Sequence, residues 1–357
     1  MLREAELPGA FRTGGTERGK NFDMKKRLLV LFVFLEINFL SFAQEARIFK
    51  EDFIIEKQSF YPSEYELFRP VIFGMEENRN NFFIYDYSQL NLYLLEEGAS
   101  QTFKVQTLGD GKGSGPREFR NPSDICIVNQ KVIISDADLA RISIWDAASH
   151  QLIRSFKTKK FVPYRIACYD DKIIAYNSSG SKEGNFLVYN LDGVLIKGIT
   201  DNTLSKDGFI DSGYIVADST FIYFGSEGKS ELKKYNYLTG NLVQVSNTIV
   251  GKIENKSRIS ISKNEDEITT KRASDFKYQT RGIGLFENWL IVFHSGRKDA
   301  HGSTLDFYNK VTLEYLFSEK IDHTFSSIDI KADKLLINSY DFERKEREFF
   351  VYKIKND

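Results

Sequence analysis

Three oxygen-bearing side chains recur at one position of an internal repeat. Asp86, Asp136 and Asn177 each lie five residues after the start of an apolar motif that marks the repeat. Carboxylate and amide oxygens are the ligands that Ca²⁺ prefers, so this row predicts a metal site in a hydrolase or lyase. The alternative is that each residue only caps the turn after its strand.

Histidines are the second set of possible metal ligands. The chain contains four, namely His150, His294, His301 and His323. His294 is the one that we expect to assist the carboxylate row, in a site for Ca or Zn. The histidines do not occupy equivalent repeat positions, so scattered surface or packing histidines are the alternative. No Gly-x-Ser-x-Gly nucleophile motif exists, and spacing indicates no catalytic Ser/His/Asp set.

Opposite charges and an aromatic ring meet at a third candidate site. Seven residues before each motif, four of the six repeats carry Gly or Ser, which would leave a central opening free. The other two carry Asp124 and Arg165, with Tyr164 and Arg281 one position earlier in their own repeats. We expect a polar pocket for an anionic or sugar-like ligand. The alternative is a structural Asp124–Arg165 ion pair.

Two further segments have both a functional and a structural interpretation. The glycines of the 109–122 loop could cradle an anion with their backbone N–H groups, but no P-loop Lys-Ser/Thr follows. A glycine-rich connector is the alternative. The 249–279 segment is an insert of Lys, Glu, Asp and Ser, which we interpret as a partner-docking flap, or else as a solvated loop or extra hairpin.

The only two cysteines, Cys126 and Cys168, fall in first strands of consecutive repeats, one position out of register. Their side chains are therefore expected on opposite faces, which argues against a disulfide. We predict two buried, unpaired cysteines. An aromatic row, Trp145, Tyr189, Tyr235 and Tyr308, is expected to pack between repeats.

A repeat must position all of these residues. A polar turn followed by three apolar residues begins at positions 81, 131, 172, 220, 289 and 334, at a mean interval of about 51 residues. Alternating apolar residues flank each motif on both sides, which is typical of strands. Each repeat thus predicts four antiparallel strands, A to D.

Six such units predict an all-β, six-bladed β-propeller that occupies 44–357 as a single domain. A long β-sandwich would not need this period. The last unit lacks strand D, so we predict that residues 46–55 complete it and close the ring. The long B–C and D–A loops share one face, and we place any binding site there.

An export signal precedes the repeats. Met24-Lys25-Lys26-Arg27, a short apolar run and Ser41-Phe42-Ala43 resemble a secretory signal peptide at 24–43, cleaved before Gln44. An uncleaved signal anchor is the alternative, although the run is short for a membrane span. Residues 1–23 are interpreted as an upstream extension. We predict a periplasmic or extracellular protein with no stable membrane span after cleavage.

Composition excludes several classes. The chain has 357 residues with 49 basic and 50 acidic side chains, a net charge of -1, which argues against a nucleic-acid partner. Two cysteines and no Cys-x-x-Cys pair exclude a disulfide scaffold and a zinc ribbon. The hydrophobic fraction of 41% excludes wholesale disorder.

One repeat carries a family resemblance. The segment from Leu108 to Ile125 resembles an NHL-type linker, Gly-x-Gly-x-Gly-Pro-x-x-Phe-x-x-Pro. The whole chain looks like the exported six-bladed propellers of Bacteroidota, related to NHL and TolB-like propellers. That resemblance implies the fold, whereas function varies widely on it.

We therefore expect a non-catalytic, monomeric binding propeller without a cofactor, for a protein, peptide or glycan partner. A metal-dependent hydrolase or lyase is one alternative. A structural component of a cell-envelope complex, docked through the insert, is another.

Overall fold

The computed structural model describes residues 47–50, 53–76, 81–98, 102–158, 161–204, 211–249, 260–264, 267–271, 279–294, 304–321, 323, 325–341 and 343–355. The predicted extension 1–23, the signal peptide 24–43, His301 and most of the 249–279 insert lie outside these residues.

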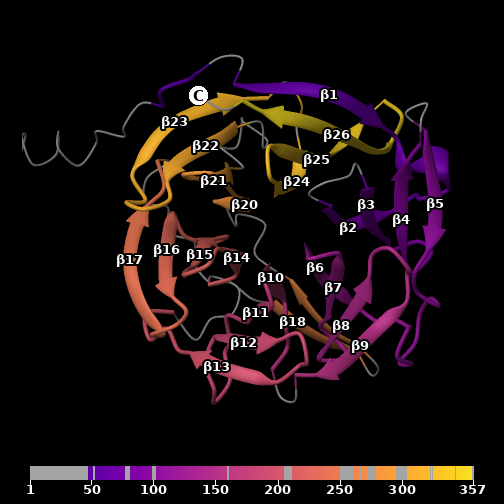
Figure 1. Ribbon diagram of the computed structural model, residues 1–357, viewed down its shortest axis with the longest axis horizontal. Coiled ribbons are helices and arrows are strands. Elements are labelled where there is room, and N and C mark those ends of the chain that lie inside the picture. Colours follow the sequence, from indigo (N-terminus) through magenta and orange to yellow (C-terminus); the bar gives the residue numbers. More distant parts are fainter. Residues whose placement is uncertain are drawn as a thin grey trace, which may run out of the picture. The chain divides into compact units, whose positions relative to one another are not determined.

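Six four-stranded antiparallel sheets surround a central channel, as predicted (Figure 1). Blade one is β2 (Pro70–Met75), β3 (Asn81–Asp86), β4 (Asn91–Glu97) and β5 (Phe103–Thr107); blade two is β6 (Pro122–Val128), β7 (Lys131–Asp136), β8 (Arg141–Asp146) and β9 (Leu152–Lys157); blade three is β10 (Arg165–Tyr169), β11 (Lys172–Tyr176), β12 (Phe186–Asn190) and β13 (Leu195–Ile199). Blade four is β14 (Gly213–Ala217), β15 (Phe221–Ser226), β16 (Glu231–Asn236) and β17 (Asn241–Asn247); blade five is β20 (Thr280–Phe286), β21 (Trp289–His294), β22 (Thr304–Asn309) and β23 (Tyr315–Lys320); blade six is β24 (Phe325–Lys331), β25 (Lys334–Asp341), β26 (Glu346–Ile354) and β1 (Ile54–Phe60). The first strands contact one another in sequence around the channel, so the ring is closed.

Apolar layers between blades hold the ring together. Strand β3 is buried along its whole length, whereas the outermost strand β17 alternates between exposed and half-buried residues. The apolar clusters draw on consecutive blades; one contains Phe83 of blade one and Trp145 of blade two. Burial of both blade faces at about 25 cal/mol per Å² of apolar surface is the main stabilising term.

The predicted aromatic row packs between blades. Trp145, Tyr189, Tyr235 and Tyr308 are each at most 5% exposed. Three of them also hold the connector that leads into their own blade. Phe119 stacks on Trp145, the Tyr235 hydroxyl donates to Asp201, and the Ile249 N–H donates to the Tyr308 hydroxyl. In blades two, four and five, strand C thus fixes where the preceding D–A connector runs.

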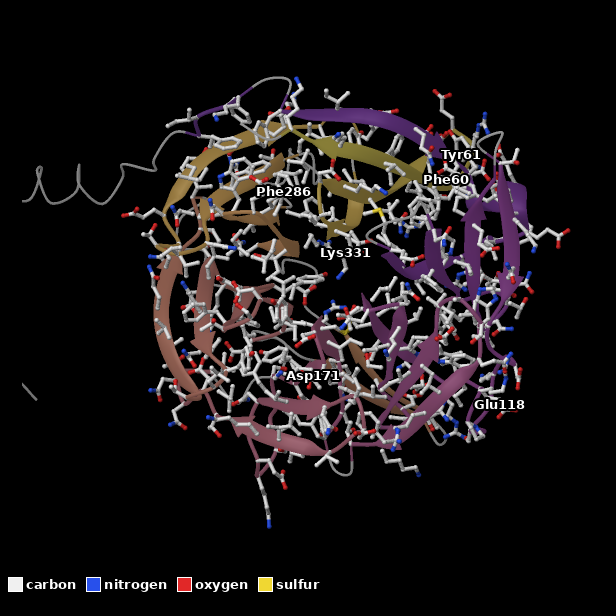
Figure 2. All side chains as sticks on the ribbon, viewed as in Figure 1. Phe60, Tyr61, Glu118, Asp171, Phe286 and Lys331 are labelled. Atoms are coloured by element: carbon white, nitrogen blue, oxygen red, sulfur yellow. A yellow bond between two sulfur atoms is a disulfide. The ribbon has the colours of Figure 1, made fainter. Side chains whose placement is uncertain are left out.

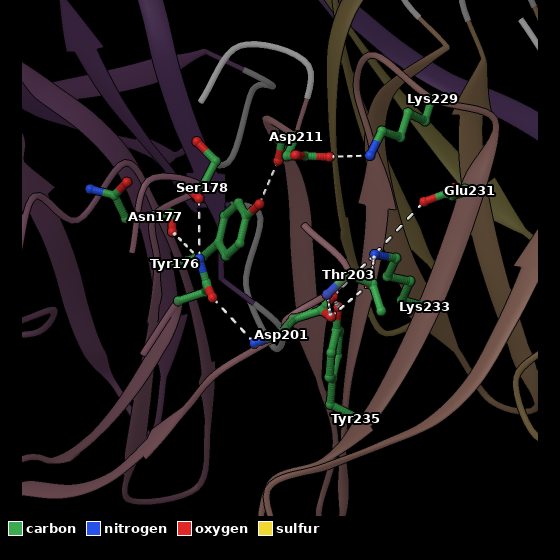
Figure 3. Close-up of polar contacts among 11 residues, drawn as sticks. Tyr176, Asn177, Ser178, Asp201, Thr203, Asp211, Lys229, Glu231, Lys233 and Tyr235 are labelled. Carbon is green, nitrogen blue, oxygen red and sulfur yellow. Dashed lines mark hydrogen bonds and ion pairs between the residues drawn. The ribbon is translucent and has the colours of Figure 1, made fainter. Parts of the chain in front are cut away.

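A buried ion pair joins the connector after blade three to blade four (Figure 3). The Lys233 ammonium, on a side chain that is 2% exposed, lies 3.0 Å from Asp201 Oδ2 and 2.8 Å from Thr203 Oγ1. Burial would raise the pKa of Asp201, but hydrogen bonds from Thr203, Tyr235 and Lys233 together lower it. Both Asp201 oxygens accept hydrogen bonds, and Lys233 also lies 3.7 Å from Glu231 Oε2, so each buried charge is paired, as burial requires.

The N-terminal chain closes the ring, with different bounds from those predicted. Strand β1 begins at Ile54, pairs with β26 and completes blade six. Residues 47–50 lie instead along the outer edge of blade five, where Phe49 forms a parallel bridge with Ser318 of β23. The backbone of Ser318 is hydrogen-bonded to Ile48 and Lys50. The N-terminal chain therefore contributes to two blades, five and six.

This strap, residues 47–50, carries a charge that blade five needs. Arg47 donates from Nε and Nη2 to the two carboxylate oxygens of Asp306, at 2.9 and 3.0 Å. The Asp306 side chain is fully buried and also accepts a hydrogen bond from Ser318 Oγ. Asp306 lies two residues before Tyr308, just as Lys233 lies two residues before Tyr235. Both blades thus bury a charge at this position.

The prediction of unpaired cysteines is wrong. Cys126 of β6 and Cys168 of β10 form a disulfide between blades two and three, with 5.9 Å between their Cα atoms. Cys126 lies opposite Ile133 and Cys168 opposite Ile173, so the two do point to opposite faces of their own sheets. Consecutive blades, however, meet through opposite faces, and both side chains enter the same apolar layer.

Part of the insert forms an extra hairpin. β18 (Ser260–Asn264) pairs with β19 (Glu267–Lys271) as a separate two-stranded sheet. This outcome agrees with the extra-hairpin alternative for the segment.

Loss of the disulfide should destabilise the ring. It closes a loop across a sequence separation of 42 residues, for which chain entropy predicts a contribution of about 2–4 kcal/mol. Cys126→Ser/Cys168→Ser should lower the free energy of unfolding in urea by that amount, and TCEP should do the same to the wild type. Equal stability of oxidised and reduced protein would contradict the pairing.

Removal of the Arg47 charge should also be costly. Arg47→Ala leaves the buried Asp306 carboxylate unpaired, and we expect a loss of about 3–5 kcal/mol in urea unfolding. The double variant Arg47→Ala/Asp306→Asn should recover part of that loss, because no unpaired charge remains. A single variant as stable as the wild type would show that the strap does not hold blade five.

Candidate functional site

The channel contains a cavity of about 460 Å³. Its wall is built from the innermost strands of all six blades, whose inward edges have no neighbouring strand to pair with. The polar side chains on the wall are Asp124, Asn129, Tyr169, Asp170, Tyr214, Asp329 and Lys331. A cavity of this size accommodates a small ligand or a single inserted side chain.

The cavity extends toward the A–B turns. Its lining includes the turn residues Asn129, Asp170 and Ala332, whereas Tyr164, Arg165 and Arg281 do not line it. These three candidates belong to the beginnings of β10 and β20, toward the B–C/D–A face that the sequence favours. The channel therefore has two chemically distinct ends.

Asp124 lies where the two ends meet. Its Oδ1 accepts from its neighbour Ile125, and its Oδ2 accepts from the Ile166 N–H of blade three at 2.9 Å. Burial raises the pKa of Asp124 to about 6, although Arg165 and these two N–H groups act in the opposite direction. The negative charge of the nearby Asp329 is a smaller part of the same increase. The carboxylate thus fastens blade two to blade three at an electrostatic cost.

Three of the four predicted binding residues gather around one tyrosine. The Arg165 guanidinium lies 4.3 Å from the Tyr214 ring centroid and donates to the Ser123 carbonyl at 3.4 Å. Burial raises the pKa of Tyr214, while the positive charges of Arg165 and Arg281 lower it. Asp124 also lies within electrostatic reach of this hydroxyl. No bidentate Asp124–Arg165 pair is seen among the contacts of the described residues.

Tyr164 provides an exposed surface next to this cluster. Its side chain is 51% exposed, although the residue directly precedes the half-buried Arg165. Two hydrogen bonds hold the loop that carries Tyr164. Ser123 Oγ donates to the Pro163 carbonyl, and Asn177 Nδ2 donates to the Val162 carbonyl. An exposed aromatic ring on a rigid loop is suited to contact a partner.

Tyr214, Asp329 and Lys331 were not among the predicted site residues. In the sheet register Tyr214 takes the place that Asp124 and Arg165 have in their own blades, opposite the fifth residue of strand B. Strand B of blade four begins at Phe221, one residue later than the repeat spacing placed it, so the sequence alignment missed this equivalence. Asp329 accepts from the Met75 N–H of blade one at 2.8 Å, and Lys331 donates to the Ile127 carbonyl of blade two at 3.0 Å. Nothing in the spacing points to those partners.

The predicted metal-ligand row binds backbone instead. Asp86 accepts from the N–H groups of Arg69, Ser88 and Gln89. Asp136 accepts from Arg120 and Leu139 in the same way. In blade three, Asn177 Oδ1 accepts from Ser179. Each residue thus caps the turn after strand B and holds the chain that enters strand A, which is the alternative described above.

The histidines do not join that row in the described part of the chain. His323 contacts Glu56 at 3.2 Å and stacks on Phe350 in blade six. His150 occupies a C–D turn. Of His294, only the backbone, as the last residue of β21, belongs to the described structure. Within the described ranges, no three His, Cys, Asp or Glu side chains are grouped to hold a metal ion.

In the glycine-rich loop, the carboxylate of Glu118 binds the backbone N–H that was expected to hold an anion. Glu118 Oε2 accepts from the Gly115 N–H at 2.7 Å, and a Cβ on Gly113 would collide with the Glu118 carboxylate. Arg141 donates to the carbonyls of Gly115 and Glu118. An internal carboxylate therefore takes the place of the predicted anion, and the loop is an ordered connector.

Comparisons with known proteins establish the fold. No protein-family model matches the chain, and no curated protein matches it. Among solved structures, the WD40 repeats of RRP9 superimpose with a TM-score of 0.51 at 9% identity, over 87% of this chain and 99% of that one. U3-55K gives 0.50 at 9% identity, over 80% and 95%.

A bacterial structure is similar to the same extent. A protein from Bacteroides fragilis, described as exported, gives a TM-score of 0.50 at 12% identity, over 87% of this chain and 98% of that one. In the described residues, no helix has the length and hydrophobicity that crossing a membrane requires. Identities this low support the propeller architecture and nothing finer.

The raised pKa of Asp124 predicts a pH-dependent stability. An unfolded aspartate titrates near 3.9, so the folded state binds the proton more tightly. The resulting stabilisation is complete below about pH 4 and is lost as pH rises through about 6. Between these values, urea unfolding of the wild type should lose on the order of 2 kcal/mol relative to Asp124→Asn. Parallel pH profiles would contradict the burial of this carboxyl.

Proposed function

We propose that this protein is an exported, non-catalytic binding propeller that holds a protein, peptide or glycan at the B–C/D–A end of its channel. The observation that supports this proposal is the cluster of Asp124, Arg165 and Arg281 around Tyr214, with the exposed ring of Tyr164 beside it. Aromatic and arginine side chains are the residues that most often dominate binding energy.

The chemistry around the cluster favours binding over catalysis. The arginines stay charged at all physiological pH values, so neither of them is suited to proton transfer. The carboxylate and amide row that would hold a metal in a hydrolase is engaged with backbone N–H and carbonyl groups. Charged and aromatic groups on rigid strands are the means by which a binding surface orients a polar partner.

Export is supported by two independent features. The leader at 24–43 has the organisation of a signal peptide. The Cys126–Cys168 disulfide fits an oxidising compartment, because thiols in the cytosol stay reduced. We propose a periplasmic or extracellular location and a monomeric state, with no nucleic-acid partner.

Two tyrosines at opposite ends of one strand test this proposal. Tyr164 precedes β10, and Tyr169 ends it at the A–B turn with 38% exposure. Tyr164→Ala should weaken a partner found by cross-linking or on a glycan array by about 2 kcal/mol, or roughly 30-fold. Tyr169→Ala should leave that affinity unchanged. If the two variants lose affinity equally, or neither does, the partner does not sit at the B–C/D–A end.

A further inference from the structure

The cavity in the channel has an excess of negative charge. The wall of the cavity carries the carboxyl groups of Asp124, Asp170 and Asp329 and a single ammonium group, that of Lys331. Arg165 is close to Asp124 but stacks over Tyr214 and does not line the cavity. Field lines are concentrated in a narrow cavity with low-dielectric walls, so its interior attracts cations.

The channel already solvates one ammonium group. Lys331 begins on blade six, extends past blade one and donates to the Ile127 carbonyl of blade two at 3.0 Å (Figure 2). Inward strand edges present carbonyl groups that lack a partner strand, and such groups are good acceptors for N–H donors. Lys331 shows that an ammonium group in this cavity takes a strand-edge carbonyl as its acceptor, with the Asp329 carboxyl within electrostatic reach.

Two of the carboxylates are held in place by backbone. Asp124 accepts from Ile166, and Asp329 accepts from Met75, so a donor of the next blade orients each group. Burial raises the pKa of both carboxyls. The groups that face Asp124 are Arg165, Tyr214 and Asp329, and the charge that faces Asp329 is that of Lys331. A further cation between them would compensate for the burial.

We propose that the cavity, entered from its A–B end, binds an alkylammonium or guanidinium group. The group enters past Asp170 at the mouth, lies between Asp124 and Asp329, and donates to the carbonyl edges as Lys331 does. The carrier is either a free small amine or a Lys or Arg side chain of a partner protein. Asp124 belongs to both sites, but Asp170, Asp329 and Lys331 line only the cavity and Tyr164 does not line it, so variants of these residues test either proposal without the other.

The first test measures small probes by calorimetry on the oxidised protein. Agmatine and 1,4-diaminobutane should bind, whereas the neutral isostere 1,4-butanediol should not. Binding should strengthen by about ten-fold from pH 5 to pH 7 and should release protons, because the cation favours ionised carboxylates. Butanediol binding as tightly as the diamine, or a pH-independent affinity, would overturn the proposal.

Two adjacent turn residues provide a matched pair of variants. Asp170 lines the cavity, whereas Asp171 does not and contacts Lys172; both are exposed. Asp170 has a φ of 52°, which Asn tolerates well, so Asp170→Asn should fold normally. It should weaken agmatine several-fold, and Asp171→Asn should have no effect. If both variants weaken agmatine binding equally, the effect comes from general surface charge, which would contradict the proposed site.

Lys331→Met provides a test in the opposite direction. It removes the internal ammonium and leaves the Ile127 carbonyl free, so affinity for the diamine should increase several-fold. Unchanged or weaker binding would contradict the proposed placement.

To identify the carrier, a Gly-Lys-Gly peptide is compared with its acetyl-lysine form and with diaminobutane. Preference for the unmodified peptide over diaminobutane assigns a protein side chain, and the reverse assigns a free amine.

Discussion

Every blade of this propeller has to bury both of its faces against its neighbours, and the rest of the structure follows from that requirement. Each apolar layer combines side chains of two consecutive sheets, as Phe83 and Trp145 do between blades one and two. The first and last blades obey the same rule through β1, which supplies the outer strand of blade six. Closure thus makes the stability of any blade depend on the other five.

Charged side chains within these apolar layers must be paired with an opposite charge from another segment of the chain. Lys233 meets Asp201 from the preceding connector, and Asp306 meets Arg47 from the N-terminal strap. The inward strand edges have no neighbouring sheet, and here side chains substitute for one. Asp124, Asp329 and Lys331 each bind a backbone group of another blade. Charge inside the channel is therefore a result of how the ring is closed.

The repeat could be predicted from sequence because apolar alternation reports burial strand by strand. The same reasoning found Asp124 and Arg165, which hold equivalent places in consecutive repeats, and Arg281, which lies one position earlier in the fifth repeat. It failed for the cysteines. Alternation within one strand shows which face of its own sheet a side chain is on, but it does not show which faces of two neighbouring blades pack together. It also missed Lys331, whose partner is a backbone carbonyl more than 200 residues away. The recurrence of Asp86 and Asp136 after strand B was recognised from the sequence, but it fitted both a metal ligand and a turn cap.

The way in which blade six is assembled has a consequence for folding kinetics. Glu56 of β1 contacts Tyr352 of β26 across a sequence separation of 296 residues. A ribosome releases β1 first and β26 last, so the earliest outer strand waits unpaired for the whole of translation. Such non-local pairing slows folding and exposes a strand edge to other chains. The chain therefore needs protection of its N-terminal strand from aggregation until its last residues emerge.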